Sequence, residues 1–251
     1  MNVHFHTMTM EEKMNQANVP EVKSYNLLSQ MAKSIADEIR NPLAGIAGTV
    51  SLLKDELNLK SDDSKLKVID DCIARIDSFV EDLYLLTRPI KPCFIKINIG
   101  SFVQQVVQYY LGNKNVHYRF LKMEKDLYVL ADIVLLQQAL TNVLDNAMDA
   151  INEHGRITLS VQKRTGSMHF PKMASIIIAD TGPGMDEETL DKIFTPFFTT
   201  KHDGRGLGLV ITHNYIAFHK GSIQVRSRKY HGTEVILDLP LSSGGVNGGT
   251  R

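Results

Sequence analysis

Two polar stretches in the second half of the sequence have spacings that suit nucleotide chemistry. In the first, TNVLDNAMDA (141–150), Asn142 and Asn146 are four residues apart, so a helix would place both amides on one face. An amide oxygen suits the hard octahedral shell of Mg²⁺, which makes Asn146 a candidate ligand. An exposed polar helix face would show the same pattern, and the motif alone leaves both interpretations open.

The second stretch, DTGPGM (180–185), directly follows the apolar run IIIA. A carboxylate at the end of a buried strand, here Asp180, can accept a hydrogen bond from an exocyclic amine. Gly182 and Gly184 would let the chain turn tightly around a ring. An ordinary Asp-Gly turn is the alternative interpretation of these six residues.

Two further motifs contain glycine. GRGLGL (204–209) directly precedes a predicted helix, so its backbone N–H groups and the helix dipole could both face phosphates. It lacks the Gly-Lys-Ser/Thr end of a Walker A loop and the preceding strand of a dinucleotide-binding fingerprint. HGTEV (231–235) is a Gly-Thr pair that enters a strand. Each of these two motifs is weak evidence by itself.

The elements that would position these motifs alternate irregularly between strand and helix. Predicted helices cover residues 100–111, 133–152 and about 207–219. Predicted strands cover residues 93–99, 116–121, 127–132, 155–164, 173–182, 221–229 and 233–240. Because this order is not a regular βαβ alternation, it predicts an α+β sandwich with helices on one face.

The first half of the chain has a purely helical pattern. Apolar residues recur at spacings of three and four and form a seam along each of two predicted helices. The first seam contains Leu28, Met31, Ile35, Ile39, Leu43, Ile46, Val50, Leu53 and Leu57, and the second contains Leu66, Ile69, Ile73, Ile76, Val80 and Leu83. The polar segment NLKSDD (58–63) between them predicts a turn, and therefore an antiparallel helical hairpin. Since a hairpin alone leaves one apolar face uncovered, we expect a second copy to complete a four-helix bundle. A monomeric hairpin covered by the rest of the chain is the alternative.

The bulk composition gives no electrostatic argument for some classes of partner. Lys plus Arg and Asp plus Glu are 28 each, so nothing in the net charge requires nucleic acid or an anionic membrane surface. The two cysteines, Cys72 and Cys93, have neither pairing nor metal-binding spacing, which favours a reducing, cytoplasmic setting. No apolar run approaches the roughly 18–20 residues of a membrane helix. We therefore expect no nucleic acid partner and no membrane span in this chain.

Taken in order, the four motifs resemble the N, G1, G2 and G3 boxes of the GHKL ATPase superfamily, and IFTPFFTTK (193–201) resembles its F box. With the helical hairpin in front, residues 24–240 resemble the catalytic core of two-component sensor histidine kinases. Within that family, the sequence PFFTTK resembles the corresponding motif of the nitrogen-regulation subgroup. Other GHKL proteins share the nucleotide fold but lack this hairpin.

The resemblance implies an α-helical hairpin, dimeric as a four-helix bundle, followed by an α+β sandwich of the GHKL (Bergerat) type. We expect an N-terminal tail or remnant of an upstream region at 1–22, and the dimerisation and histidine-phosphotransfer-like hairpin at 23–90. The ATP-binding domain would cover 91–240, and a flexible tail 241–251. The resemblance also implies ATP and Mg²⁺ as cofactors, a homodimer through the hairpin and a response regulator receiver domain as partner.

The resemblance also assigns roles to single residues. Asp180 would accept from the adenine amino group, Asn146 would hold Mg²⁺, and residues 185–203 would form a lid with Phe194 and Phe197 as latches. The implied ATP-binding residues are Asn142, Asn146, Asp180, Gly182, Gly184, Lys201, Gly204, Gly206, Leu207, Gly208 and Thr233.

The stretch SIADEIRNPL (34–43) resembles the family's H box, H-E-x-x-N-P-L, except that Asp37 stands at the phosphoacceptor position. At about 100° per residue, Asp37 points about 200° away from the seam residues Ile35 and Ile39. A carboxylate is a weaker nucleophile than imidazole, and its charge would repel a γ-phosphate oxygen by about 1–4 kcal/mol. We therefore predict that the chain binds Mg-ATP but autophosphorylates on Asp37 poorly or not at all.

Glu38 and Asn41 match the rest of the H box. The resemblance implies that Glu38 is the base for phosphotransfer and that Glu38 and Asn41 orient the water that dephosphorylates a response regulator. The expected function is that of a sensor histidine kinase with impaired autophosphorylation. The alternative is a phosphatase-biased protein, or a pseudokinase scaffold that binds a regulator under control of ATP without turnover.

Overall fold

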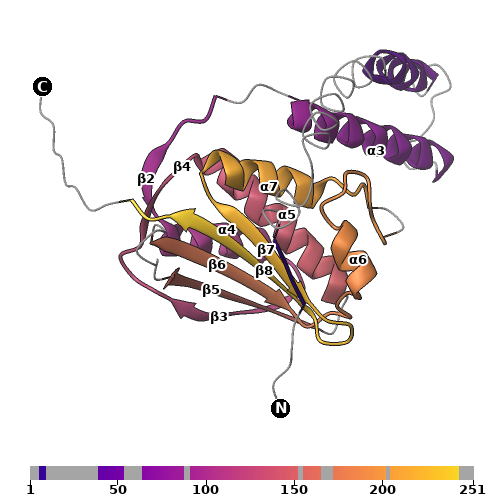
Figure 1. Ribbon diagram of the computed structural model, residues 1–251. Helices are drawn as coiled ribbons and strands as arrows, with labels where there is room; N and C mark the ends of the chain where they lie inside the picture. The colour runs from indigo at the N-terminus through magenta and orange to yellow at the C-terminus, as the bar shows by residue number, and fades with distance from the viewer. Residues whose placement is uncertain are drawn as a thin grey trace, which may run out of the picture. The chain divides into compact units, whose positions relative to one another are not determined.

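The chain divides into two compact units in the computed structural model. One unit contains residues Gln16–Ile90, and the other combines Met1–Asn15 with Lys91–Arg251. The structure describes residues 6–9, 39–53, 64–87, 91–151, 155–164, 172–201 and 204–242. Figure 1 shows these parts as ribbons.

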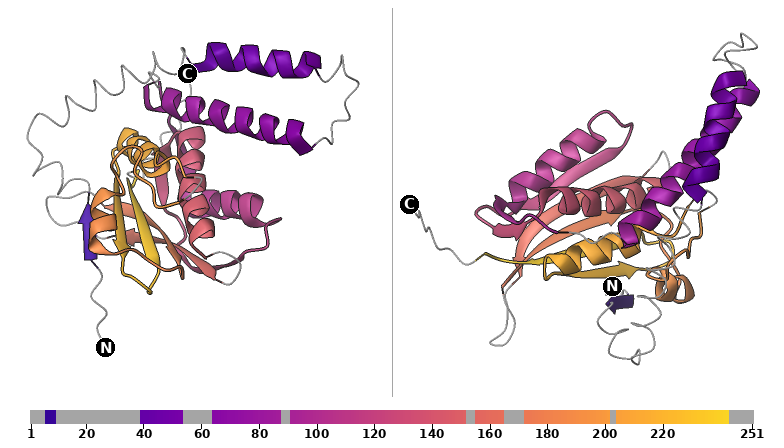
Figure 2. Two further views of the ribbon diagram at one scale, coloured as in Figure 1. Left: turned by 90° about the vertical axis from the view of Figure 1, so that its right-hand side faces the viewer. Right: turned by 90° about the horizontal axis from the view of Figure 1, so that it is seen from above.

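The described part of the first unit consists of two helices, residues 39–53 and α3 (Ser64–Thr87). They lie side by side in Figure 2, and Arg40 Nε approaches Asp77 Oδ1 across the pair at 4.0 Å. Leu43 and Val80 are buried. The apolar periodicity that predicted two helices is thus confirmed, and the residues that join them, 54–63, lie outside the described part.

The second unit is built on a six-stranded sheet with the order β1-β7-β8-β6-β5-β3. Only the β3–β5 pair is parallel; the other neighbours are antiparallel. A separate two-stranded sheet pairs β2 with β4. The strands are β1 (His6–Thr9), β2 (Ile95–Asn98), β3 (His117–Met123), β4 (Tyr128–Ala131), β5 (Arg156–Arg164), β6 (Met173–Asp180), β7 (Ser222–Ser227) and β8 (Thr233–Pro240).

Three helices cover one face of the large sheet, and this confirms the predicted α+β sandwich. They are α4 (Ile99–Leu111), α5 (Ile133–Ile151) and α7 (Gly208–Phe218); the short α6 (Glu187–Lys192) follows β6 (Figure 1). Period-2 burial on the strands provides the core: Ile176 and Ile178 of β6 are buried with Leu140 and Leu144 of α5. The core therefore lies between the sheet and the helices, and α5 packs against both α7 and β6.

The start of α5 is fixed by side chains from distant parts of the sequence. Asp132 Oδ1 accepts from the N–H groups of Val134 and Leu135 at 3.0 and 3.1 Å, as an N-cap should. The N–H of Asp132 donates to Nε2 of buried His219 at 3.0 Å, and His219 Nδ1 lies 2.6 Å from the Tyr215 carbonyl. His219 is thus a packing residue that anchors α5 to α7.

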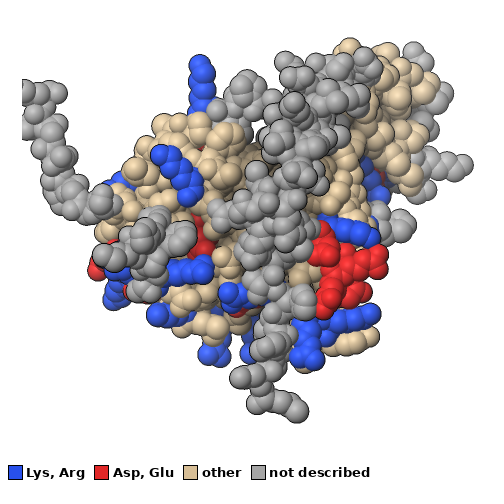
Figure 3. Space-filling model, in the orientation of Figure 1, with Lys and Arg blue, Asp and Glu red and all other residues tan. Residues whose placement is uncertain are grey.

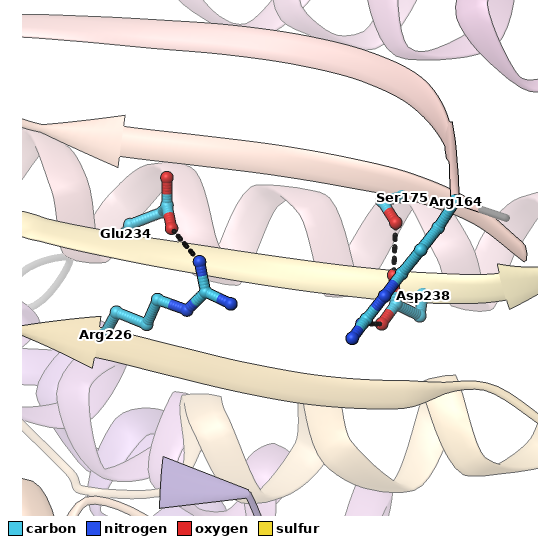
Figure 4. Close-up of polar contacts among 5 residues, drawn as sticks. All are labelled: Arg164, Ser175, Arg226, Glu234 and Asp238. Atoms are coloured by element: carbon cyan, nitrogen blue, oxygen red, sulfur yellow. Dashed lines mark hydrogen bonds and ion pairs between the residues drawn. The ribbon is translucent and has the colours of Figure 1, made fainter. Parts of the chain in front are cut away.

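The face of the sheet opposite the helices contains two cross-strand polar pairs (Figure 4). Asp238 of β8 is 2% exposed; it accepts from Ser175 Oγ of β6 and pairs with Arg164 Nη1 of β5 at 2.9 Å. Arg226 Nη1 of β7 lies 3.3 Å from Glu234 Oε2 of β8. These contacts connect β8 to its neighbours β6 and β7 and, across β6, to β5.

The N-terminal residues differ from the expectation of a tail at 1–22. His6–Thr9 form β1, which pairs antiparallel with β7 at the edge of the sheet (Figure 2). A four-residue edge strand is held by backbone hydrogen bonds, so its sequence shows no periodicity that would reveal it. At the other end the ordered chain continues past Pro240, because Ser242 N donates to the Tyr128 carbonyl at 2.7 Å. Residues 243–251 lie outside the described part.

Candidate functional site

One face of α5 brings together the polar side chains of the first motif. Lys201 Nζ donates to Asn146 Oδ1 and to Asp149 Oδ2, both at 2.7 Å. Asp149 was not predicted, although its position three residues after Asn146 places it on the same helix face. Lys201 and Asn146, far apart in sequence, therefore meet in the fold.

This cluster has the right chemistry for a divalent cation. An amide oxygen and a carboxylate oxygen converge on a positive charge, here the ammonium of Lys201, and both are the hard oxygen ligands that Mg²⁺ prefers. No group of three or more His, Cys, Asp or Glu side chains gathers anywhere in the described ranges. Asn146 and Asp149 therefore suit an ion that completes its shell with phosphate oxygens and water, as Mg²⁺ commonly does.

Asn142 connects α5 to the start of α7. Its Nδ2 donates to the Gly208 carbonyl at 3.2 Å, and Thr212 Oγ1 donates to the same carbonyl at 2.8 Å. Leu207, the residue before α7, is fully buried and offers the helix no side-chain acceptor. The first N–H groups of α7 thus lie beside Asn142 without intrahelical acceptors, an arrangement that suits an anion.

Asp180 stands at the end of β6. Its Oδ1 accepts from Gly182 N at 2.8 Å. Burial raises the pKa of Asp180 above its ordinary range, although hydrogen bonds from the N–H groups of Gly182 and Thr233 oppose the shift. A Cβ on Gly182 would lie 2.8 Å from both Ala150 Cβ and Asp180 Oδ1, so only glycine fits between β6 and the last turn of α5.

The strands next to Asp180 complete this end of the sheet. Thr233 pairs with Asp180 in the β6–β8 ladder, and its Oγ1 lies 2.9 Å from Ser227 Oγ of β7. Ser227 is 2% exposed; its hydroxyl accepts from Met185 N and donates to the Gly232 carbonyl, both at 2.9 Å. Ser227 thus links β7 to the loop after β6 and to the β7–β8 turn, a role that the sequence did not reveal.

The segment between the two glycine motifs packs against α7. Phe194 is buried and makes an edge-on contact with His213 of α7, with ring centroids 6.3 Å apart. Burial lowers the pKa of His213, with a smaller opposing contribution from a hydrogen bond to Asn214. Phe197 instead is 45% exposed, so the structure separates the two predicted latches into one buried and one exposed ring.

Glycines set the path of the second half of this segment. Gly206 has φ +69°, and a Cβ there would overlap the Phe197 backbone, whose N–H donates to the Gly206 carbonyl at 3.1 Å. Gly184 has φ +64°. Gly204 packs against Thr199 and Lys201, so the glycine loop approaches the Lys201 cluster.

The comparisons with known proteins match both units. Residues 131–243 match the family described as histidine kinase-, DNA gyrase B-, and HSP90-like ATPase, and residues 27–90 match the His Kinase A (phospho-acceptor) domain. Sporulation kinase D of Bacillus subtilis (strain 168) is 31% identical over 231 residues, which cover 89% of this chain and 44% of that relative. The chain thus combines the two domain families of a histidine kinase core, a His Kinase A (phospho-acceptor) domain followed by a histidine kinase-type ATPase domain.

Solved structures resemble the kinase core as well. Full-length ShkA in complex with AMPPNP matches with a TM-score of 0.68 at 25% identity, over 86% of this chain and 47% of that one. Histidine kinase ThkA in complex with response regulator protein TrrA matches with a TM-score of 0.61 at 25% identity, over 88% and 64% of the two chains. The kinase core spans less than half the length of Sporulation kinase D.

The H-box residues are only partly described. Asp37 and Glu38 lie outside the described residues. Asn41 is exposed near the start of the described helix, and the residues on both sides of Pro42 are helical. Among the described helices of the kinase core, none is long and apolar enough to cross a membrane.

Charge is unevenly distributed near the segment after β6. Figure 3 shows acidic side chains gathered over α6, which contains Glu187, Glu188 and Asp191 after the N-cap Asp186. Asp186 Oδ1 accepts from Thr189 N at 3.0 Å, and Lys229 Nζ approaches Asp186 Oδ2 at 4.0 Å. The start of α6 is thereby connected to the turn between β7 and β8.

Proposed function

We propose that this chain is the core of a sensor histidine kinase that binds Mg-ATP and acts on a response regulator. The observation that carries the proposal is the convergence of Lys201 on Asn146 and Asp149, next to the start of α7. Residues 91–240 would form the ATP-binding domain and residues 23–90 the dimerising hairpin. The PFFTTK sequence supports the nitrogen-regulation-like subgroup, and the two cysteines support a reducing, cytoplasmic setting.

Within this site each group has a distinct task. Asp180, held by Gly182 N and desolvated, would accept from the adenine amino group, while Thr233 lines the same end of the sheet. The glycines at 204, 206 and 208 would let backbone N–H groups meet the phosphates. Asn146 and Asp149 would hold Mg²⁺, which when bound would neutralise phosphate charge. Lys201 would then move from these two oxygens to the phosphates.

The hairpin would provide dimerisation and the docking surface for the regulator. Seam residues Ile46 and Ile76 are 52% and 42% exposed, which leaves an apolar face for a second copy. Because ThkA forms a complex with a response regulator protein, we assign a receiver domain as the partner of this hairpin. Asn41 is exposed, as a residue that meets such a partner must be.

The same proposal includes weak autophosphorylation. Asp37 replaces the imidazole nucleophile with a charged carboxylate, and its reaction with ATP would give an acyl phosphate in place of a phosphoramidate. Charge repulsion of about 1–4 kcal/mol toward a γ-phosphate oxygen adds to the barrier. Mg-ATP binding would therefore be retained while phosphoryl transfer to residue 37 is slow or absent.

The second candidate is a phosphatase-biased protein or an ATP-gated scaffold. It is favoured by the sequence at the H box, where Glu38 and Asn41 are present although the acceptor is not. Orienting a water against a phosphorylated regulator does not require a nucleophile at residue 37. The decay of regulator phosphate with and without this protein tests the idea; identical decay rates would exclude the phosphatase.

Calorimetric titration with a non-hydrolysable ATP analogue tests the nucleotide site. We expect one binding event per chain, tighter with Mg²⁺ than without, and weakened by Asn146→Ala. Gln137→Ala, an exposed change on the opposite side of α5 from Asn146, is the matched control and should bind like the unchanged chain. Absence of binding to the unchanged chain in both conditions would contradict the proposal.

A further inference from the structure

The edge of the ATPase sheet is occupied by a strand that precedes the hairpin in sequence. β1 pairs antiparallel with β7, with His6 opposite Ser227, Thr7 opposite Arg226 and Thr9 opposite Gln224. Without β1, β7 would be the edge strand, with one row of backbone groups unpaired. Residues upstream of the hairpin therefore add a strand to the domain downstream of it.

The paired end of β7 is the end that supports the nucleotide loops. His6 lies opposite Ser227, whose buried hydroxyl contacts Met185 N, the Gly232 carbonyl and Thr233 Oγ1, each at 2.9 Å. A strand with ladder bonds on both sides is less free to fray than an edge strand. Pairing with β1 thus restrains the residue that joins the loop after Asp180 to Thr233.

β1 has a second neighbour in the proposed lid. It lies beside α6, the helix that begins this segment, as Figure 2 shows at the sheet edge. α6 is also connected to the β7–β8 turn through Asp186 and Lys229, at 4.0 Å. One short strand therefore contacts both the strand that supports the adenine end of the site and the first helix of the lid.

We propose that β1 is a regulatory strand: paired with β7 and resting against α6, it holds the nucleotide loops in their binding arrangement. Its withdrawal from the sheet edge weakens ATP binding. The inference rests on the proposed function, because it assumes that this end of the sheet binds ATP. It adds a route by which a change upstream of the hairpin reaches the ATP site through backbone pairing, by β-strand addition in cis.

A cross-strand disulfide tests the pairing itself. Thr9→Cys with Gln224→Cys places two thiols directly opposite each other, in a chain whose exposed Cys72 and Cys93 are changed to Ser. The matched control, Thr9→Cys with Arg228→Cys, is four residues out of register, about 13 Å along the strand, and cannot close. We expect mild oxidation to link the first pair only. Failure of the first pair to link, or equal linking of both pairs, would overturn the inference.

Nucleotide affinity tests the consequence of pairing. We expect the oxidised Thr9→Cys/Gln224→Cys chain to bind a fluorescent ATP analogue at least about fivefold more tightly than a Thr7→Pro/Met8→Pro chain. Successive N–H groups along a strand point to alternate sides, so either residue 7 or residue 8 donates toward β7. Two adjacent prolines remove that N–H in either case. Thr7→Val/Met8→Val, which retains both N–H groups and strand preference, should bind like the unchanged chain.

The outcomes separate the inference from the proposed function. Equal affinity of the linked and proline chains, or tighter binding by the proline chain, would overturn the regulatory strand while the ATP site stands. No binding by any of these chains would overturn the ATP site and the inference with it. The oxidised and reduced forms of the Thr9→Cys/Gln224→Cys chain are also compared with each other. This comparison does not involve the proline chain, so misfolding of the proline chain would not affect it.

Discussion

At the scale of single residues, the charge of Asp180 is unfavourable for stability but suits its proposed role in binding adenine. Burial raises its pKa and makes its charge costly, yet the proposed contact with an adenine amino group needs the ionised carboxylate as acceptor. Because the folded pKa is above the unfolded one, the stability cost of Asp180 is present at neutral pH. That cost disappears as the pH falls through the folded pKa toward the unfolded value.

This conflict predicts opposite effects of Asp180→Asn on stability and on binding. The amide keeps an acceptor for Gly182 N without the buried charge, so the thermal midpoint at pH 7.5 should be equal or higher. Its amino group would face the adenine amino group, and affinity for ATP should fall at least about tenfold. Thermal melts and calorimetric titration on the same preparation measure both. A loss of stability with unchanged affinity would show that Asp180 is only structural.

His213 predicts an acid-sensitive domain. Its folded pKa is lowered by burial, so below the unfolded value of about 6.5 the unfolded chain binds a proton that the folded chain resists. Stability should therefore fall between pH 7 and the lowered folded pKa, by at most about 1.4 kcal/mol per pH unit for this one group. His213→Gln should flatten that slope in urea unfolding between pH 7.5 and 5.5. Equal slopes for both chains would contradict the assignment.

At the scale of elements, the path of the glycine loop depends on the backbone conformation of Gly206 more than on that of Gly208. Gly206 has φ +69° and no room for a Cβ, whereas a Cβ on Gly208 would meet nothing closer than 3.9 Å. Gly206→Ala should therefore lower the free energy of unfolding by about 1–3 kcal/mol, while Gly208→Ala leaves it within about 1 kcal/mol. Chemical denaturation of both chains measures this; similar losses in both would contradict it.

The regular elements could be predicted from sequence because burial periodicity encodes them. The predicted helix 133–152 is α5 (Ile133–Ile151), and the predicted strand 233–240 is β8. Boundaries shifted where a cap decides them: Asn98 Oδ1 accepts from Ser101 N, so Ile99 begins α4 where a strand had been predicted to end. β1 could not be predicted, because its order depends on a partner strand more than 200 residues later.

Only part of the candidate site could be predicted, because some of its residues meet their partners only through long-range contacts. Asn142, Asn146 and Asp180 belong to local motifs whose spacing is visible in sequence. Asp149 contacts Lys201, and Ser227 contacts Met185, because tertiary folding brings these residues together. The local sequence pattern therefore identifies the residues within a motif, whereas their long-range partners can be identified only from the folded structure.

At the scale of the whole molecule, the exposed seam of the hairpin predicts a dimer. Ile76→Glu places a charge on the seam of α3 and should weaken self-association at least about tenfold. Val68→Glu changes an equally apolar residue of the same helix that is 60% exposed but lies off the seam, and it should leave association unchanged. Sedimentation equilibrium distinguishes them. A monomeric unchanged chain would contradict the four-helix bundle.

The proposed nucleotide site, joined to a hairpin with Asp37 at the expected acceptor position, is tested most directly with labelled ATP. The chain with Asp37 and an Asp37→His chain are incubated with γ-labelled ATP and Mg²⁺, with Asp37→Ala as the blank. We predict little or no label on the Asp37 and Asp37→Ala chains and acid-labile label on Asp37→His. Stable, stoichiometric label on the Asp37 chain that is absent from Asp37→Ala would contradict the account.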